Sequence, residues 1–395
     1  MPRVNGEILK WARETTGLDR VEASRKLGIR STEGVPDPAR LEALELGQSE
    51  PSRSLLAKMA KQYRRPLLVF YLPSPPRTSS RVDDFRTLPG DQSAQDEAIL
   101  DALMRDVRAR QSMIRSLMEE EEEPALATFV GAAHIRDGVA SLADRTRELL
   151  NFDLSAFRSD PSPDAAFSRL RTAVEDIGVF VLLVGDLGSH HTAIEVETFR
   201  GIALSDQFAP FIVINDHDAR SAWSFTLLHE LVHLWLGQTG VSGAWSNLVV
   251  ERFCNDVASR LLLPIADLRS LVLSEGLDLA TLTQRIGEFA SERNLSGSMV
   301  AYRLFRHEAI SRDHWVQLRN RFRELWRNQV SLQSARNRAS DGGPNYYVVR
   351  RHRTGSRMIG FVARMLESGA LTTTKAGRIL GVKPSNVHTL VEVNS

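Results

Sequence analysis

The sequence predicts a mainly α-helical protein with one small mixed β-sheet, an α+β fold in which a central domain is flanked by smaller helical domains. Over most of the chain, apolar residues recur every three or four positions, as they do in amphipathic helices. Three short runs, residues 179–184, 198–204 and 210–215, are instead rich in branched and aromatic residues and favour strands. They precede a long apolar segment at 224–236, which we expect to be a buried helix.

Composition limits the class of protein. The chain has 395 residues, of which 42% are hydrophobic and 25% charged, with a formal net charge of +1. That length is typical of about two to four domains. The single cysteine excludes an internal disulfide framework, so we expect a cytoplasmic protein. No apolar stretch approaches the about 18 residues of a membrane span, so we expect no membrane association.

The first predicted domain, residues 1–72, consists of short helices separated by glycines and prolines. Each helix carries a narrow apolar stripe, so the helices must pack on one another. They are expected at residues 7–15, 20–27, 39–46 and 52–63. A proline-rich linker is predicted at 73–92.

The second predicted domain, residues 93–270, begins with a long helix and contains the three strands. Its helix at 224–236 carries His229, Glu230 and His233 in the spacing H-E-x-x-H. Positions four apart on a helix share a face, so His229 and His233 can bind one metal ion. Glu230 points about 100° away, beside the metal, where a carboxylate can act as a base. The pattern predicts a zinc-binding active-site helix.

A catalytic zinc site needs a third protein ligand and an open position. The segment 249–263 has a helical apolar stripe that ends before Pro264, and Glu251 near its start is the best candidate. Asp256, on another face of that helix, is the rival, and the helix dipole alone would also favour a carboxylate at position 251. Cys254 lies on the apolar stripe and is interpreted as a core residue rather than a nucleophile.

Two other groups of polar residues have two interpretations each. The loop 215–218 has the sequence N-D-H-D, which is the composition of a metal site. The same residue types are also common just before a helix, where their side chains cap its first turn, so the loop could instead cap the helix that follows it. Tyr302 and His307 could supply an oxyanion donor or could belong to the helical packing.

Two further helical units with helix-turn-helix-like patterns are predicted at 271–333 and, after a polar linker at 334–345, at 346–395. The last unit is basic, with Arg350, Arg351, Arg353, Arg357, Arg364, Lys375 and Arg378. Such a stripe is a candidate for nucleic-acid binding. A solvated face or a surface for a partner protein is the alternative.

The motifs of the second predicted domain resemble those of a known protein family. F-T-L-L-H-E-L-V-H at 225–233, E-R-F-C-N-D-V-A at 251–258 and L-L-L-P at 261–264 together resemble the ImmA/IrrE family of bacterial zinc peptidases. The similarity covers roughly residues 80–310. Cys254 and Val257 depart from the small and aromatic residues expected of the family.

This resemblance implies a zincin-like core that binds Zn²⁺ through His229, His233 and Glu251, with Glu230 as the general base. It also implies a repressor-type protein as substrate. Three strands before the zinc helix fit this arrangement, because an extended peptide can pair with an edge strand through main-chain hydrogen bonds.

The N-terminal domain carries a second resemblance. L-K-W-A-R-E at 9–14, A-S-R-K-L-G-I at 23–29 and L-E-L-G at 44–47 resemble the Xre/Cro-type helix-turn-helix family. In that family the third helix lies in the major groove of DNA. By resemblance, the contacts with DNA phosphates would come from Arg25, Lys26, Arg30 and Arg40.

The segment that would read DNA, residues 30–46, is lengthened and is acidic at Glu42 and Glu45. A non-binding or dimerising remnant is therefore the alternative to a DNA-binding domain.

Three functions follow from these observations. The first is a cytoplasmic zinc-dependent endopeptidase and transcriptional regulator that cleaves or controls a repressor-type protein. The second is a DNA-binding antitoxin or autoregulator of a toxin-antitoxin pair, with a structural or weakly active zinc site. The third is a helical scaffold with a vestigial motif. The expected partners are a repressor-type substrate or a cognate toxin, DNA, and a second copy of the chain in a homodimer.

Overall fold

The computed structural model describes residues 3–31, 35–76, 94–120, 125–188, 192–242, 248–271, 273, 277–339 and 345–392. Its contacts divide the chain into two compact units. One comprises Met1–Val107 with Leu187–Ile194, and the other comprises Arg108–Asp186 with Glu195–Ser395. The predicted linker at 73–92 lies outside the described residues from position 77 onwards.

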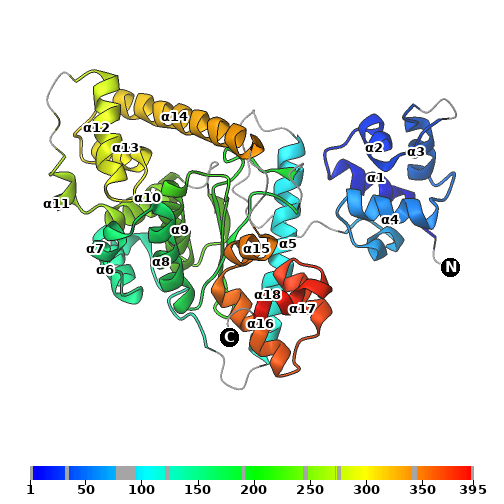
Figure 1. The fold of residues 1–395 in the computed structure, drawn as a ribbon. Helices are drawn as coiled ribbons and strands as arrows, with labels where there is room; N and C mark the ends of the chain where they lie inside the picture. Colours follow the sequence, from blue (N-terminus) through cyan, green and yellow to red (C-terminus); the bar gives the residue numbers. More distant parts are fainter. Residues whose placement is uncertain are drawn as a thin grey trace. The chain divides into compact units, whose positions relative to one another are not determined.

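The first unit contains the four predicted helices, each within one residue of its expected ends. They are α1 (Gly6–Glu14), α2 (Arg20–Leu27), α3 (Pro38–Glu45) and α4 (Arg53–Gln62), followed by the 3₁₀ helix η1 (Leu67–Tyr71) (Figure 1). Each α-helix begins at a side chain that accepts a hydrogen bond from a backbone N–H of its first turn, and these caps are Asn5, Asp19, Asp37 and Ser52. Leu9, Leu41 and Tyr63 are among the fully buried residues of the shared core.

The second unit is built around a four-stranded mixed sheet with the strand order β1-β3-β2-β4. The three predicted strands are confirmed as β1 (Phe180–Leu183), β2 (Gly201–Leu204) and β3 (Phe211–Ile214). β1 pairs with β3 in parallel, and β2 pairs with β3 antiparallel. A fourth strand, β4 (Gly240–Ser242), was not predicted, and it pairs antiparallel with β2. One edge of the sheet is thus β4, which follows the H-E-x-x-H helix, and the other edge is β1, which precedes it.

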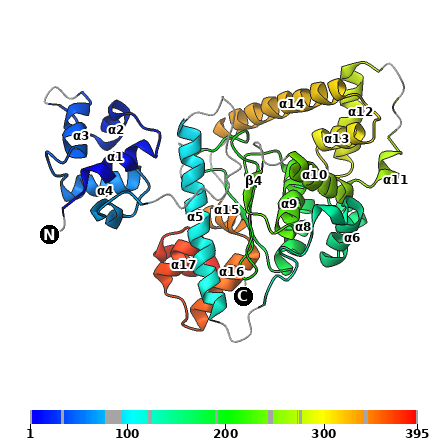
Figure 2. The same cartoon turned by 180° about the vertical axis from the view of Figure 1, so that it is seen from behind.

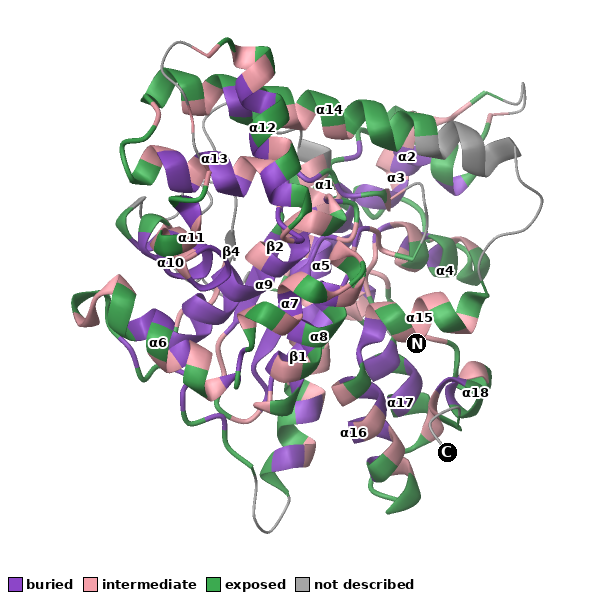
Figure 3. Ribbon diagram, turned by 60° about the vertical axis from the view of Figure 1, so that its left-hand side comes forward, coloured by how far each residue is buried: buried purple, intermediate pink, exposed green. Residues whose placement is uncertain are grey.

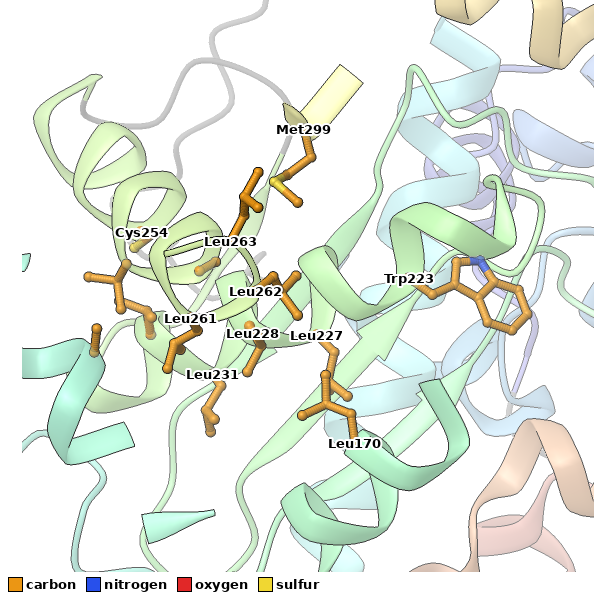
Figure 4. Close-up of a cluster of buried hydrophobic side chains, with 14 of the residues drawn as sticks. Leu170, Trp223, Leu227, Leu228, Leu231, Cys254, Leu261, Leu262, Leu263 and Met299 are labelled. Atoms are coloured by element: carbon orange, nitrogen blue, oxygen red, sulfur yellow. The ribbon is translucent and has the colours of Figure 1, made fainter. Parts of the chain in front are cut away.

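Two helices cover one face of the sheet. They are α8 (Pro163–Asp176) and α9 (Arg220–Trp235), while α10 (Leu248–Leu262) packs on α9 and on α6 (Val139–Leu149) (Figure 1). All residues of β1, β2 and β3 are buried and none is polar, and alternate residues such as Val181, Ile212 and Ile214 enter the core under these helices. Side chains from α8, α9, α10 and α13 form a single cluster (Figure 4), and it appears as the buried centre of the second unit in Figure 3.

The opposite face of the sheet is also buried. From Arg108 onwards, α5 (Ala94–Glu119) runs along it, and the Gln111 amide donates hydrogen bonds to the carbonyls of Leu204 and Ala209 at 3.2 and 2.8 Å (Figure 2). Phe180 of β1 meets Phe361 edge to face, with the ring centroids 5.9 Å apart. The strands read as continuous apolar runs because both of their faces are covered.

The helices after the sheet continue the same core. α11 (Ile265–Leu268), α12 (Leu279–Ser291), α13 (Gly297–Arg306) and α14 (Arg312–Ala339) follow α10. Ile286, Val300 and Leu318 belong to the cluster that includes α9 and α10. The apolar core is therefore continuous across the predicted boundary at 270–271. α14 extends to Ala339, so the predicted linker at 334–345 begins as helix, and residues 340–344 lie outside the described residues.

The chain ends in a small helical tail, residues 345–392. It consists of α15 (Tyr346–Thr354), α16 (Ser356–Glu367), α17 (Thr373–Leu380), η4 (Pro384–Asn386) and α18 (Val387–Val391). α15 and α16 pack against β1, and α16 also contacts α8. The shorter elements elsewhere are η2 (Ile135–Asp137) and α7 (Leu154–Ser159). In the part of the chain that the structure describes, no helix has both the length and the apolar character that crossing a bilayer requires.

Candidate metal centre

Two crossing helices bring three predicted ligands together. α9 presents His229 and His233 one turn apart, and α10 presents Glu251 in its first turn. The two histidine Nε2 atoms are 3.1 Å apart. Glu251 Oε2 lies 3.2 Å from His229 Nε2, and Glu251 Oε1 lies 3.2 Å from His233 Nε2. The three side chains converge on one point although 18 positions separate His233 from Glu251.

These separations fit a tetrahedral metal ion. With zinc–nitrogen and zinc–oxygen bonds of about 2.0–2.1 Å, neighbouring ligand atoms of a tetrahedral site lie about 3.3 Å apart. The observed 3.1 and 3.2 Å are close to that value. An ion could enter between the three side chains with only small adjustments of their rotamers.

Two groups of the cluster have shifted pKa values. Burial lowers the pKa of His233, but its contacts with Cys254 and Glu251 outweigh burial and raise that pKa well above its ordinary value. Burial raises the pKa of Glu251, but contacts with His229 and His233 lower it well below the ordinary range. A metal ion binds the neutral imidazole, so it would compete with a proton for His233.

A hydrogen bond at Nδ1 of each imidazole would fix the orientation of the ring. His233 Nδ1 lies 3.3 Å from Gln238 Oε1, and a hydrogen bond donated by Nδ1 would leave the Nε2 lone pair for a metal. His229 Nδ1 is buried and has no hydrogen-bond partner among the described residues. Gln238, just beyond the end of α9, was not singled out from the sequence, since orienting residues follow no fixed spacing.

Glu230 lies next to the cluster and not in it. It is fully buried and is close enough to His233 for its charge to raise the pKa of that imidazole. Its carboxylate packs against Gly201 of β2: a Cβ atom built on Gly201 would lie 2.2 Å from Glu230 Oε1. Only glycine leaves room there for the carboxylate. The sequence placed Gly201 in a strand but gave no sign of this contact.

Cys254 lies one turn after Glu251 on α10. It is buried in the apolar core, as expected, and burial raises the pKa of its thiol. A neutral thiol is a poor nucleophile, which agrees with the interpretation from the sequence. The thiol is nevertheless also beside the cluster, because ligand atoms of His229, His233 and Cys254 all lie within 4.8 Å of one another.

The rival ligand Asp256 has other partners. Its carboxylate accepts two hydrogen bonds from Arg306, at 2.8 and 2.7 Å, and one from the Tyr302 hydroxyl at 2.7 Å. Tyr302 therefore holds α13 to α10 through Asp256, and His307 is exposed at the end of α13. These contacts favour the packing interpretation of Tyr302.

The loop 215–218 is likewise held by contacts within the chain. Asp216 binds Arg353 at 2.6 Å, and Asp218 binds Arg200 at 3.0 Å. The Asn215 side chain accepts a hydrogen bond from the His217 backbone N–H at 3.0 Å. The two carboxylates are neutralised by arginines, which supports a structural role for this loop before α9.

The four predicted DNA contacts lie in the first unit. Arg25, Lys26, Arg30 and Arg40 are exposed. Lys26 and Arg25 lie 2.9 and 3.9 Å from Glu22 on the same helix. α2 and α3 are joined by residues 28–37, which is longer than the three or four residues usual in a helix-turn-helix.

Most guanidinium groups at the start of the basic tail bind the chain itself. Arg350 donates to the carbonyls of Leu380 and Gly381 at 2.8 and 2.7 Å, and Arg351 donates to those of Leu390 and Thr389 at 3.0 and 2.9 Å. In addition, Arg353 pairs with Asp186 and Asp216, and Arg357 donates to the carbonyl of Glu175. These four residues hold the tail together and dock it, which weakens the nucleic-acid interpretation of this stripe.

A buried H-E-x-x-H helix that meets a carboxylate from a second helix, beside a small mixed sheet, is the arrangement of a metallopeptidase-like domain. Residues 183–305 match the family model Peptidase_M78: IrrE N-terminal-like domain. The match runs from the end of β1 to the end of α13 and covers less than half of the chain. No curated protein and no solved structure matches the chain.

Proposed function

We propose that this protein is a cytoplasmic zinc-dependent endopeptidase that acts on a repressor-type protein. The observation that carries the proposal is the meeting of His229, His233 and Glu251 at mutual distances of 3.1–3.2 Å. Three protein ligands are the number that a catalytic zinc site uses. The family match over residues 183–305 supports the same class of activity.

Each residue of the centre has a distinct role in this proposal. Zinc bound by these ligands supplies an activated water and a polarised scissile carbonyl. Glu230 accepts the proton of the attacking water on a carboxylate oxygen and passes it to the nitrogen of the leaving amine. Gly201 keeps room for that carboxylate, and Gln238 orients His233. β4 stands at an end of the sheet, where an extended peptide can add as a further strand.

Zinc content tests the ligand set. We expect one zinc ion per chain in the purified full-length protein and a large loss in His229→Ala and Glu251→Ala. His307→Ala and Glu292→Ala are matched controls, because both side chains are exposed and distant in sequence from the cluster. Wild-type protein without zinc, or the Ala variants at 229 and 251 with full zinc, would refute the metal site.

Cleavage tests the chemistry separately. Glu230→Gln should keep its zinc and lose turnover of a co-expressed repressor-type protein by about 10²–10⁴-fold, the usual contribution of a general base. Cleavage that persists in Glu230→Gln at the wild-type rate would contradict the role assigned to Glu230.

The N-terminal unit supports a second candidate function, DNA binding by a regulator or antitoxin. The acidic residues that weaken this interpretation have partners: Glu45 binds Arg13 at 2.5 Å and Arg20 at 3.0 Å, and Glu42 binds Arg20 at 2.7 Å. Their charge is neutralised within the fold. The exposed Arg30 and Arg40 remain available to phosphates.

A mobility-shift assay on DNA from upstream of the gene tests this second function. If each arginine contacts a phosphate, Arg30→Ala and Arg40→Ala should each reduce the salt slope of binding by about 1. Binding that does not depend on salt concentration, or no binding, would leave the peptidase as the function of the chain. Retained DNA binding in a protein without zinc would favour the regulator.

A further inference from the structure

Cys254 shares a helix face with the metal ligand Glu251. The two residues are three positions apart on α10, and side chains at that spacing project from the same side of a helix. Cys254 is fully buried, and ligand atoms of Cys254, His229 and His233 lie within 4.8 Å of one another. The cluster therefore offers four donors from two helices: two imidazoles, one carboxylate and one thiol.

The distances allow the thiol to reach an ion held by the other three donors. A zinc–sulfur bond of about 2.3 Å and a zinc–nitrogen bond of about 2.0–2.1 Å place sulfur and nitrogen about 3.6 Å apart in a tetrahedral site. The ligand atoms of Cys254, His229 and His233 all lie within 4.8 Å of one another, a range that includes this separation. Thiolate is also a preferred zinc ligand.

We propose that Cys254 is a fourth protein ligand, which closes the metal centre in the resting protein. This inference rests on the zinc site proposed above. Zinc sites with four protein ligands are closed, whereas catalytic sites keep one position for water. Water can therefore enter the coordination sphere only when the Cys254 sulfur leaves it, and peptide hydrolysis depends on that exchange of ligands.

X-ray absorption at the zinc edge tests this proposal in the full-length protein. The wild type should show one sulfur neighbour at about 2.3 Å together with nitrogen and oxygen neighbours at about 2.0–2.1 Å. The chain has one cysteine, so a thiolate signal is assigned without ambiguity. Cys254→Ala should keep its zinc and lose the sulfur neighbour. Ser259→Ala, another buried small side chain on α10, should keep both.

A cobalt-substituted protein tests whether the centre is closed. Azide, a small anion that binds open metal positions, should change the visible spectrum of cobalt in Cys254→Ala and leave that of the wild type unchanged. A thiolate-to-cobalt charge-transfer band should be present in the wild type and absent from the variant.

The outcomes separate the two proposals. Zinc bound without a sulfur neighbour, or azide binding equally well to both proteins, overturns the role of Cys254 and leaves the three-ligand site in place. Wild-type protein that binds no zinc overturns the proposed metal centre itself, and the role of Cys254 with it.

Discussion

Glu175 joins the tail to α8, and its charge can be removed without changing its size. Its carboxylate accepts hydrogen bonds from the backbone N–H groups of Ser356 and Arg357 at 3.1 and 3.2 Å, and from the Ser356 hydroxyl. The N-cap of α16 is Gly355, which has no side chain to cap the helix. A residue of α8 therefore satisfies the free donors at the start of α16.

The magnitude of the effect of Glu175→Gln follows from its partner Arg171. Arg171 is 7% exposed and donates to Glu175 at 3.0 Å. Breaking a buried ion pair by removing one partner costs about 3–5 kcal/mol, because the other charge stays buried. Arg171 keeps its hydrogen bonds to the carbonyls of Val181 and His352, so we expect the lower end, about 3 kcal/mol.

Hydrogen exchange measured by mass spectrometry can detect this change locally. A loss of about 3 kcal/mol corresponds to an increase of about 100-fold in the exchange rate of amides in α16, if the tail opens as a unit. Asp176→Asn is the matched control, because Asp176 is exposed on the same helix, and surface substitutions usually change stability by less than about 0.5 kcal/mol. Equal exchange in the two variants would refute the capping role of Glu175.

Three further predictions concern the centre and the N-terminal unit. Gly201→Ala should displace the Glu230 carboxylate and reduce turnover by about 10²-fold at unchanged zinc content, measured by cleavage and metal analysis. Glu45→Gln should destabilise the N-terminal unit by about 3 kcal/mol or more, measured by limited proteolysis, because Arg13 is 6% exposed and loses its buried partner. Removing the metal with a chelator should destabilise the central domain by about 2.7 kcal/mol relative to protein with zinc at 100 times its Kd, measured by thermal unfolding.

Each substitution has a control. Gly360→Ala adds a methyl group where nothing lies within 4 Å, so turnover should not change. Glu42→Gln should cost less than about 1 kcal/mol, because the Glu42 side chain is 46% exposed. A loss of zinc from Gly201→Ala would contradict the role of Gly201 as a spacer for Glu230 alone. Equal resistance of Glu45→Gln and Glu42→Gln to proteolysis would count against the buried pair of Arg13 and Glu45. A melting temperature that does not respond to the chelator would count against a bound metal.

The elements and donors that the sequence predicts correctly are those whose signal is local. The helices of the N-terminal unit and the three main strands have clear periodicity and clear ends, so they were predicted within a few residues. His229 and His233 are four apart on one helix, and Glu251 follows at the start of the next, so a short stretch of sequence contained the three donors. β4 escaped prediction because a strand of three residues with a glycine has almost no pattern.

Contacts between distant positions could not be predicted. The arginines of the tail formed a basic stripe in the sequence, but only the fold shows that Arg353 reaches Asp186 and Asp216. The exclusion of a side chain at Gly201 depends on a helix that begins 19 positions later. In the same way, Cys254 looks like a core residue by its spacing, and its closeness to the two histidines appears only when α9 and α10 cross.

The packing of the tail against β1 determines how the protein can be truncated. Phe361 and the guanidinium group of Arg357 both lie against the ring of Phe180, on the strand at one end of the sheet. A shortened version that stops before α15 would present an aromatic ring and an unprotected strand to solvent, and such edges recruit other chains. Truncation intended to isolate the domain that contains the metal centre should therefore yield aggregates, and soluble material requires the final helices.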